Sequence, residues 1–269
     1  MNILIVGCGV MAHALFSSSQ GGSPNLNFFC YDIIPDKAQQ LASFLNGQSV
    51  TSLEGLSPHV IFIAVKPQDF RSMASSLIPL ISPQVVIYSI MAGIKTDAIQ
   101  AKLGPEKLKI IRLMPNTPCA VKEGTIIYYP SELVTQEDKA NLTNLFKESG
   151  KVFPLDKEDQ LDFITPISGS GPAYLVELAN IFSSFLQSKG IPQELSEQIS
   201  VQTIYGSGKW LSKSSFSFQK LKEQVASKQG VTGEVLTSLE QADMEKLWHE
   251  AFQKGLRRTF QLSEEFGPS

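Results

Sequence analysis

Residues 3–12 read ILIVGCGVMA, a short apolar run followed by a Gly-x-Gly-x-x-Ala pattern. The run is typical of a buried β-strand, and the residues after the pattern predict a helix. Gly7 would permit the tight turn, Gly9 would let the backbone approach a pyrophosphate, and Ala12 is small enough for close helix–strand packing. The stretch therefore favours a dinucleotide-binding turn, with a plain tight turn as the alternative.

Asp32 supports the nucleotide interpretation. It lies 20 residues past Ala12 and directly follows a second apolar run, Phe28–Tyr31. A carboxylate at this place can accept hydrogen bonds from the ribose hydroxyls of NADH, and it would repel the 2′-phosphate of NADPH. The next two residues are isoleucines, which offer no cation to that phosphate. We therefore expect NADH to be favoured, while a cap for the helix that Pro35 begins is the alternative role.

The first half of the chain alternates apolar runs with helical segments. Further runs cover residues 60–65, 85–90 and 108–113, and Pro35 and Pro67 suit the first turns of helices. Continuous apolar strands separated by helices predict a doubly wound, mostly parallel sheet covered on both faces. We expect this α/β Rossmann domain over residues 1–160.

Candidate ligand-binding segments follow the third, fourth and fifth runs. They are Ala64–Gln68, Ser89–Gly93 and Met114–Pro118. Ligands of open α/β sheets bind at the carboxyl ends of the strands, so these segments are expected to meet at one edge of the sheet. Lys66 could instead be a plain surface charge, and Asn116 could belong to a proline-rich turn without a ligand.

The second half has a different character. After about residue 160 the apolar residues follow helical spacing, which predicts an all-α domain over residues 161–269. Its apolar stripes fit either an internal core or burial against a second subunit. Ser168–Tyr174 reads SGSGPAY, for which a close helix crossing is the simpler interpretation.

Composition excludes several classes of function. The 269 residues are 42% hydrophobic and 18% charged, with a net charge of −3, so neither disorder nor nucleic-acid binding is expected. The longest apolar run, Val60–Val65, is far shorter than the ~20 residues of a membrane span. Three scattered cysteines and three scattered histidines favour a reducing, cytoplasmic setting and no bound metal.

Taken together, the motifs resemble those of the pyrroline-5-carboxylate reductase family along the whole chain. The residues that carry this resemblance are Gly7–Ala12, Val65–Gln68, Met91–Gly93, Met114–Pro118 and Ser168–Tyr174. The resemblance implies a Rossmann domain followed by an all-α dimerisation domain. It also implies a homodimer, in some members a decamer of five dimers. The implied reaction is the reduction of 1-pyrroline-5-carboxylate to L-proline with NADH or NADPH, the last step of proline biosynthesis.

The resemblance also implies the cofactor contacts. They are Gly7, Cys8, Gly9, Val10, Met11, Ala12, Asp32, Ala64, Val65, Lys66, Pro67, Met91, Ala92, Gly93 and Asn116. The implied substrate is a small molecule that faces the nicotinamide across the dimer interface.

A late loop carries the implied substrate contacts. Thr232 matches the family threonine whose hydroxyl meets the ring nitrogen, and Ser227, Gly230 and Val231 match the residues that hold the carboxylate. Glu158 matches an acidic residue near the substrate. Lys228 and Gln229 replace a proline and a glycine of the family loop. Because of this change, two alternative functions stay open: a reductase of another cyclic imine, or a weakly active nucleotide-binding relative.

Overall fold

The computed structural model describes residues 1–227 and 230–266, and it divides the chain into two compact units. The first unit contains Met1–Ser170 and the described residues from Gly255 onward, and the second contains Gly171–Lys254. The long helix α11 (Met244–Phe266) therefore begins in the second unit and ends in the first. Among the described residues, none of the helices combines the length and apolar character that crossing a bilayer requires.

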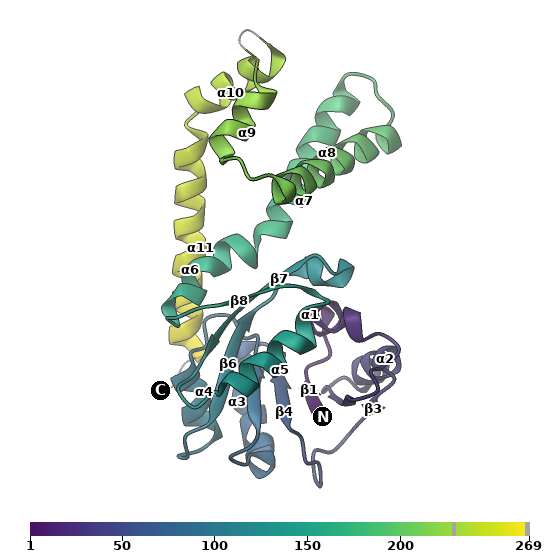
Figure 1. Ribbon diagram of the computed structural model, residues 1–269, viewed down its shortest axis with the longest axis vertical. Helices are drawn as coiled ribbons and strands as arrows, with labels where there is room; N and C mark the ends of the chain where they lie inside the picture. The colour runs from purple at the N-terminus through teal and green to yellow at the C-terminus, as the bar shows by residue number, and fades with distance from the viewer. Residues whose placement is uncertain (228–229, 267–269) are drawn as a thin grey trace. The chain divides into compact units, whose positions relative to one another are not determined.

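The first unit is built on one eight-stranded sheet with the order β3-β2-β1-β4-β5-β6-β7-β8 (Figure 1). Its strands are β1 (Asn2–Val6), β2 (Asn27–Tyr31), β3 (Gln48–Ser49), β4 (Val60–Ile63), β5 (Val86–Ser89), β6 (Lys109–Met114), β7 (Gly124–Pro130) and β8 (Gly150–Pro154). Only the pairing of β7 with β6 is antiparallel. The predicted doubly wound, mostly parallel sheet is therefore confirmed.

Helices cover both faces of this sheet. They are α1 (Val10–Leu15), α2 (Pro35–Leu45), α3 (Pro67–Leu77), α4 (Thr96–Leu103), α5 (Gln136–Phe146) and α6 (Asp159–Ser168). Along β1, Ile3 and Ile5 enter the apolar cluster on one face, whereas Leu4 and Val6 enter the cluster on the other. Because successive strand residues point to opposite faces, a strand buried on both sides must be apolar throughout.

Three strands lie outside the predicted apolar runs. β3 has only two residues, and β8 is an edge strand whose residues are mostly exposed or half-buried. β7 runs antiparallel to its neighbour β6, so no crossover helix separates the two strands in sequence. These strands extend the sheet on both sides without changing its central part.

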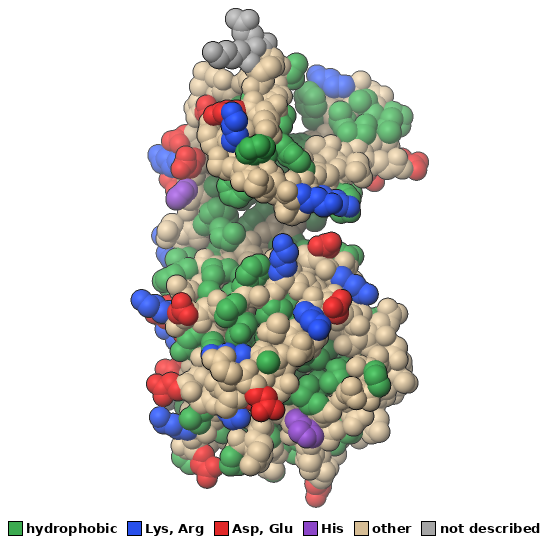
Figure 2. All heavy atoms as spheres, viewed as in Figure 1, with side chains coloured by type: hydrophobic (Ala, Val, Ile, Leu, Met, Phe, Trp, Pro, Cys, Tyr) green, Lys and Arg blue, Asp and Glu red, His purple; other side chains and the backbone are tan. Residues whose placement is uncertain are grey.

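The second unit is all-α, as predicted: its described residues form helices and short loops and no strand. It holds α7 (Gly171–Ser188), α8 (Gln193–Lys213), α9 (Phe218–Val225), α10 (Val231–Gln241) and the first part of α11. Leu221 is the only apolar side chain of this unit that is buried among those described, and α7 and α8 bury small residues such as Ser183 and Ser200. Apolar side chains gather on its surface, over α7 and α8 in particular (Figure 2). The unit therefore lacks an apolar core of its own.

Candidate functional site

Gly7 lies where β1 and β4 end side by side. Its φ is 94°, and its N–H donates to the carbonyl oxygen of Tyr31 at 2.9 Å. A Cβ placed on Gly7 would lie 2.7 Å from the carbonyl carbon of Ala64, so a side chain cannot be accommodated without moving backbone. The strand order changes direction between β1 and β4, and ligands of doubly wound sheets bind at this point.

Gly9 leaves open space above the same turn. It caps α1 with φ −82° and ψ −173°, and no heavy atom lies within 4 Å of where its Cβ would be. The first N–H groups of a helix have no acceptor inside the helix and attract anions. The turn therefore fits a pyrophosphate, since it provides both donors and room.

A cavity of about 580 Å³ opens beside this turn. Six predicted cofactor residues line it, namely Gly7, Gly9, Asp32, Ala64, Val65 and Lys66. The remaining walls come from the start of α2, including Lys37, and from one face of α3, including Met73. Its volume lies in the range of cofactor and ligand pockets. The first unit therefore provides a cavity suited to a dinucleotide.

Asp32 braces the glycine turn. One carboxylate oxygen accepts the N–H of Cys8 at 2.8 Å, and the other accepts the N–H of Ile34 at 2.9 Å. The bond to Ile34 stays within the turn before α2 and is not the expected helix cap, because Ile34 is the N-cap of α2 and no side chain caps the helix. The bond to Cys8 is a contact that the sequence does not indicate. Its contact with a ribose stays a prediction.

Cys8 and Val10 line a second cavity, of about 540 Å³, which Gly9 of the same turn also lines. A hydrogen bond with Cys30, together with burial, raises the pKa of the Cys8 thiol well above its ordinary value. The thiol is therefore protonated at neutral pH and is a poor nucleophile. Met11, Ala12 and Pro67 occupy the first turns of α1 and α3, and Ala12 is buried.

The turn Met91–Gly93 follows β5 and is mostly buried. Met91 and Gly93 are buried, and Gly93 has a φ of 76°. A Cβ on Gly93 would lie 2.7 Å from the carbonyl oxygen of Thr259, so the end of α11 packs directly on this turn. The cofactor contact predicted for these residues stays a prediction, and the exposed part of Ala92 is where it would occur.

Asn116 holds the loop after β6 in place. Its side-chain amide donates to the carbonyl oxygen of Ser168 at 3.2 Å, and its side-chain carbonyl accepts the N–H of Thr125 at 2.8 Å. Both ends of the side chain are therefore engaged within the first unit. These two hydrogen bonds are a sufficient structural role for Asn116 without a bound ligand. Its predicted cofactor contact stays untested.

A buried ion cluster lies near the carboxyl end of β6. Arg112 is 1% exposed, and its guanidinium binds Glu158 at 3.0 Å and Asp162 at 2.9 Å. Glu158 also accepts the backbone N–H of Thr96 at 2.7 Å and its hydroxyl at 3.0 Å. The structure thus places Glu158 among protein partners. An arginine within an apolar strand is the sequence signal for such a cluster, because a buried charge requires partners.

The predicted substrate residues meet in the second unit, at the start of α10. Gly230 caps the helix, and its N–H donates to the carbonyl oxygen of Ser227 at 3.1 Å. Val231 is strongly exposed and Thr232 is half-buried. Lys228 and Gln229, which depart from the family loop, lie outside the described residues. The structure brings Ser227, Gly230, Val231 and Thr232 together, and it places Glu158 in the other unit.

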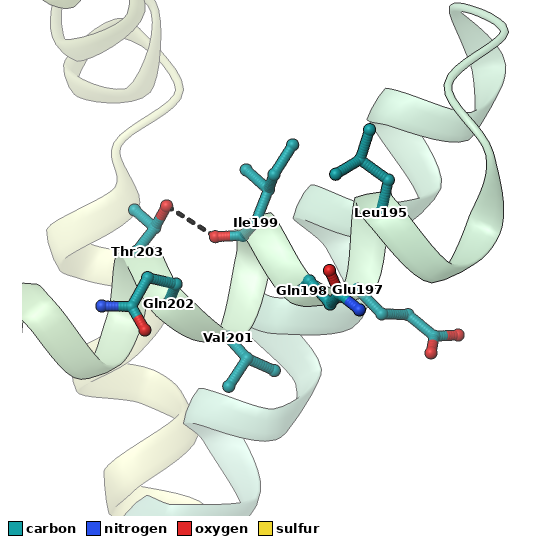
Figure 3. Close-up of a pocket in the computed structure, with 7 residues that line it drawn as sticks. All are labelled: Leu195, Glu197, Gln198, Ile199, Val201, Gln202 and Thr203. Carbon is teal, nitrogen blue, oxygen red and sulfur yellow. Dashed lines mark hydrogen bonds between the residues drawn. The ribbon is translucent and has the colours of Figure 1, made fainter.

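A wide hollow of about 770 Å³ is lined by residues of α8 alone, and Figure 3 shows side chains such as Leu195, Glu197 and Ile199 leaving that helix. Because all of its lining residues belong to one helix, this hollow is a face of α8 that no other described helix covers. Within 1–227 and 230–266, no His, Cys, Asp and Glu side chains group as metal ligands.

Comparison with known proteins gives consistent matches for both units. Residues 2–93 match the family model for NADP oxidoreductase coenzyme F420-dependent, and residues 158–262 match that for pyrroline-5-carboxylate reductase dimerisation. A pyrroline-5-carboxylate reductase of Arabidopsis thaliana is 31% identical, covering 76% of this chain and 73% of the relative. The reductase of Pseudomonas aeruginosa is 27% identical over 96% of this chain and 90% of the relative.

Solved structures agree with these matches. A pyrroline carboxylate reductase from Plasmodium falciparum with NADP bound has a TM-score of 0.83 and 28% identity, covering 97% of this chain and 98% of that one. The corresponding enzyme from Coxiella burnetii has a TM-score of 0.85 and 25% identity, with the same coverage.

Proposed function

The chain belongs to the pyrroline-5-carboxylate reductase family, and on this premise we propose that it reduces 1-pyrroline-5-carboxylate to L-proline with NAD(P)H. The observation that carries the proposal is the open glycine turn of the first unit, which fits the pyrophosphate of the cofactor. The nicotinamide supplies a hydride when it is bound. The substrate is proposed from the names of the relatives, and the loop at the start of α10 contains hydroxyl and backbone N–H groups suited to bind it.

The roles of the chain's own residues follow from this chemistry. The imine reacts as its iminium, which already carries the proton on nitrogen, so no strong protein acid is needed. Thr232 accepts that N–H through its hydroxyl and orients the ring. Ser227 and the backbone N–H of Val231 bind the carboxylate, and Gly230 joins them only by giving up the hydrogen bond from its N–H to the carbonyl oxygen of Ser227. Most of the rate comes from holding the two reacting carbons at ~3–3.5 Å, since orientation supplies up to ~7–11 kcal/mol.

The direct test is an assay of NADH oxidation with 1-pyrroline-5-carboxylate and, in parallel, with a six-membered cyclic imine. Turnover of the five-membered substrate at a higher kcat/KM supports the proposal. Preference for the other ring would identify a different imine reductase. NADH binding without turnover of either ring would leave only a nucleotide-binding relative.

NADH is the cofactor we propose as preferred. Asp32 lines the cavity, where its carboxylate would accept ribose hydroxyls and oppose a 2′-phosphate. The difference in kcat/KM is expected to be about 5- to 150-fold, which corresponds to ~1–3 kcal/mol. Steady-state kinetics with both cofactors measure it. Equal values or an NADPH preference would contradict the proposal, and Lys37, in the same cavity, would then be the phosphate partner to test by Lys37→Gln.

A homodimer is the proposed minimal active form, with a decamer of five dimers as its larger assembly. The exposed apolar side chains of α7 and α8 support it, because a stable monomer rarely leaves so much apolar surface in water. Light scattering is expected to find no monomer at working concentration, and specific activity is expected to fall on dilution below the dissociation constant. A fully active monomer would contradict this prediction.

Thr232→Ala is expected to lower kcat/KM for the imine by roughly 10- to 150-fold, because one hydrogen bond to a charged partner is lost (~1.5–3 kcal/mol). NADH affinity is expected to change little. Gly230, not Thr232, is the N-cap of α10, so the loss of a cap does not explain such an effect. Thr232→Ser keeps the hydroxyl and serves as the control. Wild-type kinetics with a lower melting temperature would leave Thr232 a purely structural role.

Two broader assignments complete the proposal. Residues 1–160 bind the cofactor, and residues 161–269 form the helical dimerisation and substrate domain. The two compact units instead divide after Ser170 and after Lys254. The proposed functional domains and the compact units therefore have different bounds. Three unpaired, buried cysteines support a cytoplasmic location, where thiols stay reduced.

A further inference from the structure

We propose that Glu158 positions the turn Met91–Gly93 and, through it, the nicotinamide end of the cofactor, rather than contacting the substrate. The proposal rests on the proposed function, because the turn's contact with the cofactor is part of that function. It concerns residues of the first unit only.

The partners of Glu158 are the first observation. One of its oxygens accepts the backbone N–H of Thr96 and an N–H of Arg112, and the other accepts the hydroxyl of Thr96. Thr96 is the first residue of α4 and follows Gly93 by three positions. Glu158 therefore holds the point at which the chain leaves the turn and enters α4. A carboxylate is favourable there, because the first N–H groups of a helix attract negative charge.

The burial of Arg112 is the second observation. Its guanidinium is held between Glu158 and Asp162, and both it and Asp162 are almost completely buried. Glu158 is 17% exposed, so it cannot rotate towards a ligand without leaving Arg112 short of a partner. Arg112 would then keep only Asp162, and the loss of one charge-assisted hydrogen bond from a buried cluster opposes that rotation. This argues against direct contact with the substrate.

The opposite side of the turn is also fixed. The backbone of α11 packs on Gly93, whose missing Cβ is what allows this approach, and Thr259 there is buried. The turn is thus held by α11 at Gly93 and by Glu158 at Thr96. With one of the two removed, the turn can shift relative to β5, while the glycine turn after β1 keeps its own contacts.

The test compares two ligands by titration calorimetry. On the proposed function NADH would reach both turns, whereas ADP-ribose, which lacks the nicotinamide, would reach only the turn after β1. In Glu158→Gln the amide oxygen can accept both N–H groups and the NH₂ can donate to the Thr96 hydroxyl, so the change removes the negative charge that pairs with Arg112 and lies at the start of α4. NADH affinity is expected to fall about tenfold, ADP-ribose affinity to change less than about twofold, and KM for the imine at saturating NADH to stay unchanged.

Asp159→Asn is the matched control, since Asp159 is the neighbouring carboxylate and pairs with Lys95 on the surface. It is expected to leave both affinities unchanged. Thr96→Val, which keeps the backbone N–H bond, is the milder variant if Glu158→Gln does not fold, and it should lower NADH affinity alone. Equal losses for both ligands, or a raised KM with unchanged NADH affinity, would overturn the proposal. Failure of the unmodified protein to bind NADH would instead refute the proposed function.

Discussion

Gly7→Ala is expected to destabilise the first unit by about 3 kcal/mol or more, and to lower its melting temperature by about 6–12 °C. Two causes add up. An alanine at a φ of 94° is strained, and its Cβ would lie 2.7 Å from backbone atoms of Ala64. Because β1 and β4 must separate to relieve the collision, NADH binding is expected to be lost as well. Thermal melts followed by NADH titration measure both effects.

Gly9→Ala is the matched control for this change. Its backbone conformation suits any residue, and its Cβ would meet no heavy atom within 4 Å, so folding is expected to be unaffected. The new methyl group would occupy the space assigned to the pyrophosphate, and NADH affinity is expected to fall by roughly tenfold or more. If Gly9→Ala bound NADH normally, the cofactor would not lie against this turn.

Arg112→Met is expected to destabilise the first unit by about 3–5 kcal/mol, since it leaves the carboxylates of Glu158 and Asp162 without their cation. Lys95→Met is the control, because Lys95 pairs with Asp159 on the surface, where such a pair contributes ~0–1 kcal/mol. Urea unfolding curves of the two variants give the comparison. Adding Asp162→Asn to Arg112→Met is expected to restore part of the loss. Equal stabilities for Arg112→Met and Lys95→Met would show that the cluster contributes nothing beyond a surface pair.

Much of the sheet could be predicted because its central strands are buried on both faces. Such strands must be apolar along their whole length, and this leaves an unmistakable run such as Val60–Ile63. The edge strand β8 has no such requirement, since most of its residues are at least partly exposed. β7 pairs antiparallel with β6. The alternation of apolar runs with helical segments predicts parallel strands, so it indicates neither the direction nor the register of β7.

The candidate site could likewise be predicted from the sequence only in part. The glycine turn could be predicted because its pattern is short and directly follows a buried strand, although the backbone of Ala64 that excludes a Cβ at Gly7 comes from a distant part of the chain. The cluster around Arg112 joins residues 46 and 50 positions apart, so only the folded chain shows that Glu158 is engaged there. Asn116 is similar, because its partner Ser168 lies 52 positions away. The sequence motifs name Glu158 and Asn116 but not Arg112, and the structure alone shows what these side chains bind.

The contact between Gly93 and Thr259 has a consequence for biosynthesis. It joins residues separated by most of the chain, so the turn after β5 cannot reach its final environment while residues 255–266 are still inside the ribosome. Contacts of such long sequence separation form late in folding. The turn after β5 is translated early but can complete its contacts only after synthesis of α11. During translation the nascent chain therefore leaves this side of the turn uncovered, and the affinity of ribosome-bound chains for NADH should rise once α11 has emerged.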